Sequence, residues 1–179
     1  MSGTTSNALN HVELLYRPGE RDLAKRLFEV LGCRAVDRGG TWFTAFVAAD
    51  GADWSNNVLY ASEVTTEQWA FEQTLLASTG EAPERTAYLD RLRREPQRSF
   101  HFGIRMADAA ALEAACERVR QAGADGGELA GRVRLAGVFR PGDDGAVADT
   151  MVQAFVWTDV VASGLLTIGQ HIELQWQLA

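Results

Sequence analysis

The chain has 179 residues, 46% of them hydrophobic, which is enough for one substantial core or two small fused modules. Its formal net charge of −7, with no run of basic residues, argues against nucleic acid or a membrane surface as partner. The only two cysteines, Cys33 and Cys116, show no CxxC pairing, and apolar residues never run long enough to span a bilayer, so we expect free thiols in a cytoplasmic protein.

The first predicted element is a strand at residues 11–16, after a small polar tail at residues 1–10. Its apolar residues alternate with polar ones, so that His11 and Glu13 share the polar face. A helix is predicted next, because apolar residues recur at helical spacing until Gly32. Three strand-like stretches follow, at residues 33–37, 41–48 and 57–63. Residues 11–64 therefore read as one βαβββ unit.

Residues 65–98 differ in composition from this unit. They are charged and rich in helix formers, and Pro83 divides them into two stretches. We expect a helical connector here.

The same order of elements returns in residues 99–179. His101 and Arg105 occupy the polar face of a strand, and Asp108 is a plausible N-cap for a helix that ends at Gly123. Strand-like stretches follow at residues 128–135, 151–161 and 166–176, while residues 137–150, rich in Gly and Asp, are predicted to form a mobile loop. The interval from His11 to Gly32 is 21 positions and that from His101 to Gly123 is 22, which indicates a duplicated unit.

The last predicted strand places His171 and Glu173 on its polar face, so every histidine of the chain lies on such a face. No GxGxxG loop occurs, and no dinucleotide cofactor is implied. A helix can cover only one face of each sheet, so the polar faces must meet a partner module or a ligand.

Four stretches resemble the vicinal oxygen chelate superfamily, which includes glyoxalase I, methylmalonyl-CoA epimerases, fosfomycin-resistance transferases and extradiol dioxygenases. They are Asn10-His-Val-Glu-Leu-Leu, Asp22-Leu-Ala-Lys-Arg-Leu-Phe-Glu-Val-Leu-Gly, Ser99-Phe-His-Phe-Gly-Ile-Arg and Gln170-His-Ile-Glu-Leu. The resemblance covers nearly the whole chain except the connector. It implies an α+β fold in which two βαβββ modules form cupped mixed sheets around a divalent metal, with helices on the outer face. The metal ligands that it implies are His11, His101 and Glu173.

The family's fourth ligand position falls on Tyr60, where glyoxalases and epimerases usually have a carboxylate or an amide. A phenol is mostly protonated at neutral pH and is a poor ligand for most divalent metals. Two imidazoles and one carboxylate remain, a set that suits Fe²⁺ first, with Mn²⁺, Zn²⁺ or Ni²⁺ as other candidates.

The resemblance thus implies a metal-dependent enzyme that acts on a small substrate with vicinal oxygens. A ring-cleaving dioxygenase is one expectation, and isomerases, lyases and transferases are close relatives. The metal would act as a Lewis acid, with His171 or Glu13 moving protons and Tyr60 donating to a developing oxyanion. Arg105 would hold a substrate carboxylate or phosphate. A solvated Glu13 and a purely structural Tyr60 are the alternative interpretations.

The competing hypothesis is a metal-free protein that binds or sequesters a small molecule, as bleomycin-resistance proteins do. The aromatic content of the chain and Tyr60 at the fourth position favour it. For either function we expect a small-molecule partner, and a homodimer because relatives often pair their sheets.

Overall fold

The computed structural model describes residues 9–37, 39–54 and 56–178, so most of the predicted tail at residues 1–10 lies outside the described residues. No helix in these ranges is both long and apolar enough to cross a bilayer. In chain order, the elements are β1 (His11–Tyr16), α1 (Arg21–Val30), β2 (Arg34–Asp37), β3 (Trp42–Phe46), β4 (Val58–Glu63), α2 (Thr66–Thr79), α3 (Pro83–Arg94), the 3₁₀ turn η1 (Pro96–Arg98), β5 (His101–Arg105), α4 (Ala109–Gly123), β6 (Val133–Phe139), β7 (Met151–Thr158), β8 (Val161–Ala162) and β9 (Gln170–Gln177).

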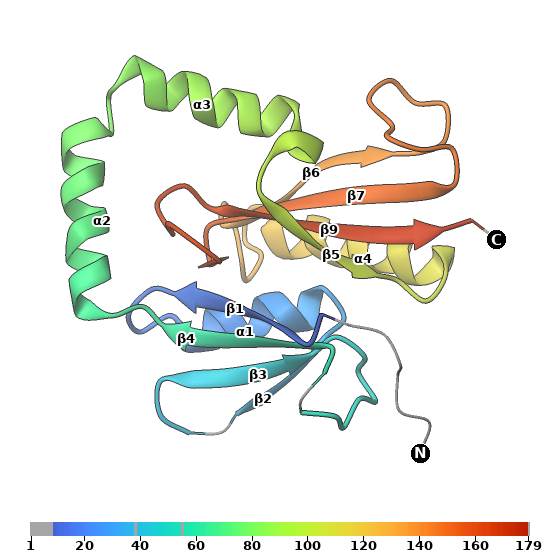
Figure 1. Cartoon of the computed structure of the whole chain (residues 1–179), viewed down its shortest axis with the longest axis horizontal. Coiled ribbons are helices and arrows are strands. Elements are labelled where there is room, and N and C mark those ends of the chain that lie inside the picture. The colour runs from blue at the N-terminus through green and yellow to red at the C-terminus, as the bar shows by residue number, and fades with distance from the viewer. Residues whose placement is uncertain (1–8, 38, 55, 179) are drawn as a thin grey trace.

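The strands form two sheets that repeat one topology (Figure 1). In the first sheet, of order β2-β3-β4-β1-β8, β1 runs parallel to β4, and in the second, of order β5-β9-β7-β6, β5 runs parallel to β9. The remaining pairs are antiparallel. This confirms the predicted α+β fold of two βαβββ modules with mixed sheets. One strand departs from the repeat, because the short β8 follows β7 in sequence but pairs with β1 of the first sheet.

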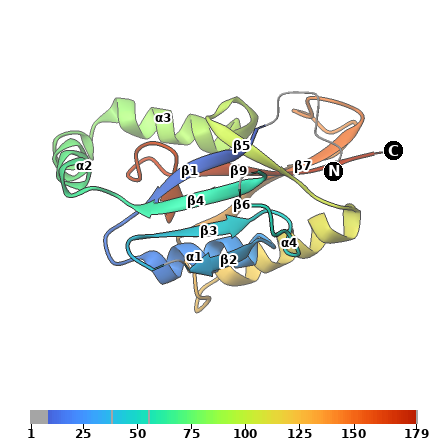
Figure 2. The ribbon, with the colours of Figure 1, turned by 60° about the horizontal axis from the view of Figure 1, so that its bottom comes forward.

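The helices lie on both sides of the sheets (Figure 2). Helices α1 and α4 cover one side, as predicted for an outer face, whereas α2 and α3 of the connector lie on the opposite side. We call this opposite side the inner face. Trp157 of β7 lines a cavity together with residues of α2 and α3, so it lies on the inner face. Its cross-strand partner His171, and Glu173 two residues further along β9, share that face.

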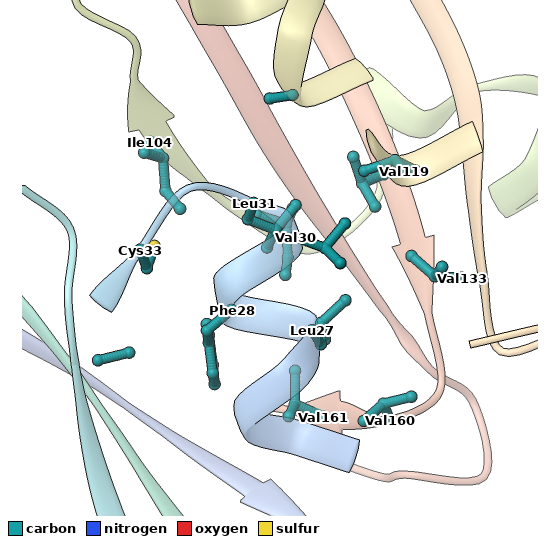
Figure 3. Packing of buried hydrophobic residues seen from close by; sticks show 14 of the residues in the cluster. Leu27, Phe28, Val30, Leu31, Cys33, Ile104, Val119, Val133, Val160 and Val161 are labelled. Atoms are coloured by element: carbon teal, nitrogen blue, oxygen red, sulfur yellow. The ribbon is translucent and has the colours of Figure 1, made fainter. Parts of the chain in front are cut away.

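The two modules share one hydrophobic core on the outer side. Side chains of α1, among them Leu27 and Val30, lie on the side of the helix that faces Val119 and Val133 of the second module, and all four belong to one hydrophobic cluster (Figure 3). Leu27 and Phe28 are fully buried, and truncating a side chain of this kind to alanine costs about 2–5 kcal/mol of stability. The core also holds Cys33 and Cys116, which are free, as predicted.

Two helix ends follow the sequence signals. The Asp108 carboxylate accepts a hydrogen bond from the Ala111 N–H at 2.8 Å and so caps α4, whose last residue is Gly123. Gly32 ends the first helical segment with φ at +93°, a conformation that side-chain-bearing residues rarely adopt.

Two strands begin later than predicted. The stretch predicted from residue 128 starts as β6 only at Val133, because Leu129 is fully buried and its N–H donates to the Ala122 carbonyl at the end of α4. The stretch predicted from residue 166 starts as β9 at Gln170, after Gly169 at φ +83°. Apolar residues in turns that pack on the core explain both errors.

Backbone bonds to a single loop residue anchor the connector helices. Glu72 of α2 is fully buried and accepts from the Thr167 N–H at 2.9 Å, while Arg85 of α3 donates to the Thr167 carbonyl at 3.1 Å. The loop before β9 therefore holds both helices over the inner face.

Candidate functional site

Of the three predicted metal ligands, the structure brings two together. Strands β5 and β9 are parallel neighbours, and the His101 Nε2 atom lies 3.3 Å from the Glu173 Oε2 atom. The other carboxylate oxygen of Glu173 accepts from the Gln153 amide at 2.7 Å. The side chains of His101 and Glu173 are 24% and 10% exposed, so the pair lies in a partly enclosed position on the inner face.

A hydrogen bond to the backbone determines which ring nitrogen of His101 carries a proton. The His101 Nδ1 atom lies 2.9 Å from the Ser99 carbonyl oxygen, which can only accept, so Nδ1 carries a proton. The Nε2 lone pair would then face a carboxylate oxygen, and a cation placed between these two atoms would relieve the contact.

His11 lies apart from this pair, on β1 of the other sheet. It is exposed, its Nδ1 atom lies 2.6 Å from the Asn10 side-chain oxygen, and its ring centre is 5.2 Å from that of Tyr60. Across the described ranges, no three His, Cys, Asp or Glu side chains are gathered closely enough to hold a metal ion. Among the described residues, His11 therefore does not form a three-ligand group with His101 and Glu173.

A groove of about 540 Å³ separates the two histidines. It lies between the starts of β1 and β4 in the first sheet and β5 in the second, with His11 on one wall and His101 and Arg105 on the other. Arg105 is exposed there. Arg105, predicted to bind substrate, therefore lines the same groove as the predicted metal ligands His11 and His101, but the two histidines lie on opposite walls.

His171 is buried next to the His101–Glu173 pair. Ser99 donates its hydroxyl proton to the Pro96 carbonyl at 2.7 Å and lies 2.9 Å from His171 Nδ1, so Nδ1 must donate to the serine oxygen. The buried Nε2 atom has no partner among the described residues. Burial, followed by the charges of Arg134 and His101, lowers the pKa of His171 to about 4. At neutral pH the ring is uncharged, which disfavours the predicted proton transfer by His171.

Glu13 and Tyr60 belong to a different place, a cavity of about 320 Å³ on the inner face of the first module. Glu13 accepts a 2.6 Å hydrogen bond from Ser62, and the Tyr60 hydroxyl donates to the Trp54 carbonyl at 2.7 Å. We call this cavity the aromatic cup. Its lining residues are Glu13, Trp42, Thr44, Trp54, Tyr60 and Ser62.

Sequence reasoning did not assign a role to Trp42, Trp54 or Thr44. Trp42 and Trp54 are 40% and 37% exposed, which is unusual for tryptophan, and the buried Thr44 hydroxyl has no partner among the described residues. One signal was available: Trp42 and Thr44 are two positions apart on a predicted strand and so share a face.

Comparisons with known proteins add little to this geometry. No family model matches the sequence, and the search of curated proteins finds no significant match. Among solved structures, the chain is similar to a protein from Bacillus anthracis proposed to belong to the glyoxalase family, with 12% identity, 96% of each chain covered and a TM-score of 0.45. It is also similar to the protein UcmS2, with 16% identity, 95% of this chain and 98% of that chain covered, and a TM-score of 0.43. The fold is therefore described by its own topology, two βαβββ modules with mixed sheets.

Proposed function

We propose that the protein is a small-molecule binding protein whose aromatic cup holds a planar organic cation without a metal. The observation that supports this most is the exposure of Trp42 and Trp54 in one cavity with Tyr60 and a single carboxylate, Glu13. Aromatic rings left in contact with water favour an apolar or planar ligand, and their faces also attract cations.

The charge of the cup favours a cation over an anion. Among its described lining residues, Glu13 is the one carboxylate and there is no arginine or lysine. The Ser62 hydroxyl donates to one of the two carboxylate oxygens of Glu13. The unpartnered Thr44 hydroxyl adds a hydrogen-bonding group at the buried wall of the cup. A planar molecule with a protonated amine satisfies both features.

Calorimetric titration with 1-naphthylmethylamine, a planar cation at neutral pH, tests this proposal against the neutral isostere 1-naphthalenemethanol. We expect the amine to bind more tightly than the alcohol. Glu13→Gln should weaken binding of the amine about tenfold and leave that of the alcohol unchanged, because only a charge-assisted contact is lost. Trp42→Ala should weaken both ligands, because the apolar surface is lost.

The matched controls are Phe71→Ala, which removes an exposed aromatic ring of α2 outside the cup, and Asp22→Asn, which removes an exposed carboxylate of α1. Neither should change either affinity. Equal losses in Trp42→Ala and Phe71→Ala, or an amine that binds no better than the alcohol, would count against the proposal.

A second candidate function, a metal-dependent enzyme, is favoured by one observation, the contact between His101 Nε2 and Glu173 Oε2. An imidazole nitrogen and a carboxylate oxygen are both donors that divalent metals accept. Elemental analysis of protein purified without chelator or affinity-tag metal separates the two functions. Stoichiometric Fe, Mn, Zn or Ni that disappears in His101→Ala would favour the enzyme, whereas metal-free, folded protein that binds the amine favours the binding protein.

A further inference from the structure

A second cavity, of about 470 Å³, lies between the connector helices and the inner face of the second module. We call it the arginine cavity. Its floor is Arg134 of β6 and Trp157 of β7, which stand opposite each other in the sheet, and its cover is formed by α2 and α3. It shares no lining residue with the aromatic cup.

Four guanidinium groups reach this cavity from distant parts of the chain, although the protein carries a net charge of −7. They belong to Arg17, Arg85, Arg93 and Arg134. Among the described lining residues Asp159 is the one carboxylate, and it already bonds two arginines, Arg17 at 2.8 Å and Arg132. The lining of the cavity therefore holds more arginines than its own carboxylate can neutralise.

The arginines differ in how far they are satisfied. Arg85 donates to the Thr167 carbonyl, and Arg93 bonds Asp90 of its own helix at 2.6 Å. The Nε atom of Arg17 is buried and has no partner among the described residues. A buried N–H donor without an acceptor is costly, so this atom indicates a place for an acceptor from outside the chain.

Arg134 is the arginine with the least compensation. Its guanidinium carbon lies 4.0 Å from the centre of the Trp157 ring, and it forms no ion pair with any described carboxylate. Burial and then the charge of Arg93 lower the pKa of Arg134, with only partial compensation from Asp159. The guanidinium groups of Arg93 and Arg134 thus repel each other, and an anion placed between them would relieve this repulsion.

Most of the remaining lining is apolar, with Leu76, Leu89, Leu92 and Ile168 beside Trp69 and Trp157, while Gln73 and Thr167 are the polar exceptions. An inorganic ion would leave this surface in contact with water, whereas an apolar body attached to an anionic head would cover it. From the arginines that Asp159 does not neutralise and the largely apolar walls, we propose that the arginine cavity is a binding site for a small organic carboxylate with an aryl or similarly apolar body.

In the bound state the carboxylate would lie between Arg93 and Arg134, where a guanidinium can donate two parallel hydrogen bonds. The apolar body would lie against the leucines that α2 and α3 present to the cavity. This site is separate from the aromatic cup, so one chain would hold a cation and an anion in two different cavities.

Calorimetric titration of the whole protein with 2-naphthoate and its neutral isostere 2-naphthamide tests this site. We expect saturable binding of the naphthoate, at least tenfold tighter than that of the amide and weakened by added salt. Arg134→Gln and Arg93→Gln should each weaken naphthoate binding about tenfold with little effect on the amide. Arg94→Gln, which changes the neighbouring exposed arginine of α3 outside the cavity, should leave both affinities unchanged.

Two further variants test the site. Because Arg134 is partly buried, Arg134→Lys serves as a second variant that keeps the charge, and it should retain part of the preference for naphthoate. The Trp42→Ala variant separates the two sites, because it should bind naphthoate normally even if it no longer binds 1-naphthylmethylamine. No saturable naphthoate binding, equal affinity for acid and amide, or equal losses in Arg93→Gln and Arg94→Gln would overturn the proposal.

Discussion

The buried imidazole of His171 couples the stability of the fold to pH. Its pKa is about 4 in the folded protein and 6.5 as the ordinary value, so the unfolded chain binds the proton more readily. The stability associated with the neutral ring is fully present above pH 6.5 and is lost as the pH falls toward 4. A shift of this size corresponds to about 3 kcal/mol, and most of it is lost by pH 4.5.

Urea unfolding of the wild type and of His171→Gln at pH 7.5 and pH 4.5 measures this effect. Both proteins lose stability through their carboxylates, but the wild type should lose about 2–3 kcal/mol more than the variant over this interval. Equal losses would mean that His171 is hydrated or finds a partner for its proton in the folded state. Circular dichroism at pH 7.5 checks that the variant keeps the fold.

At the same scale, the candidate site was predictable only in part. Alternation along each strand places His101 and Glu173 on the same face of one sheet, and they do meet at 3.3 Å. It also gives the correct face for His11, but it says nothing of how far the edges of two sheets stand apart, and a groove separates them. Faces follow from local periodicity, whereas distances between sheets follow from packing.

At the scale of elements, the cap of α4 is a local interaction whose contribution can be isolated. The Asp108 carboxylate satisfies the Ala111 N–H, one of the donors that a helix start leaves without an intrahelical partner. Asp108→Ala should lower the free energy of unfolding by about 1 kcal/mol, whereas Asp108→Asn keeps an acceptor and should cost much less. Denaturant unfolding of both variants measures the difference, and similar losses in the two would exclude capping as the cause.

The element boundaries show what sequence patterns could and could not supply. Helix ends have chemical markers, so Asp108 and Gly32 were predictable from residue type alone. Strand starts have weaker markers, and an apolar residue such as Leu129 reads as strand even though it packs in a turn. The pairing of β8 with the first sheet depends on a contact between modules, which no local pattern contains.

At the scale of the whole molecule, arginines that form no run in the sequence gather in space. The ion pairs that join the two modules likewise connect residues that lie far apart in the sequence. Arg132, just before β6, donates two hydrogen bonds to Glu20, just before α1, at 3.1 and 2.9 Å, and also bonds Asp159. Burial alone would lower the pKa of Arg132, but its bonds to Glu20 and Asp159 outweigh burial and raise it.

From these contacts of Arg132 with Glu20 and Asp159, we predict that Arg132 stabilises the arrangement of the two modules. Arg132→Ala leaves Glu20 and Asp159 without their shared partner while they are about three-quarters buried, and we expect a loss of about 1–3 kcal/mol in unfolding free energy. Arg140→Ala is the matched control, because its ion pair with Glu113 is half exposed and should be worth less than about 1 kcal/mol. The two variants are compared by urea unfolding at low and high salt, since only the exposed pair should be strongly screened. Similar small losses in both would mean that the shared hydrophobic core, rather than the ion-pair network, fixes how the modules sit together.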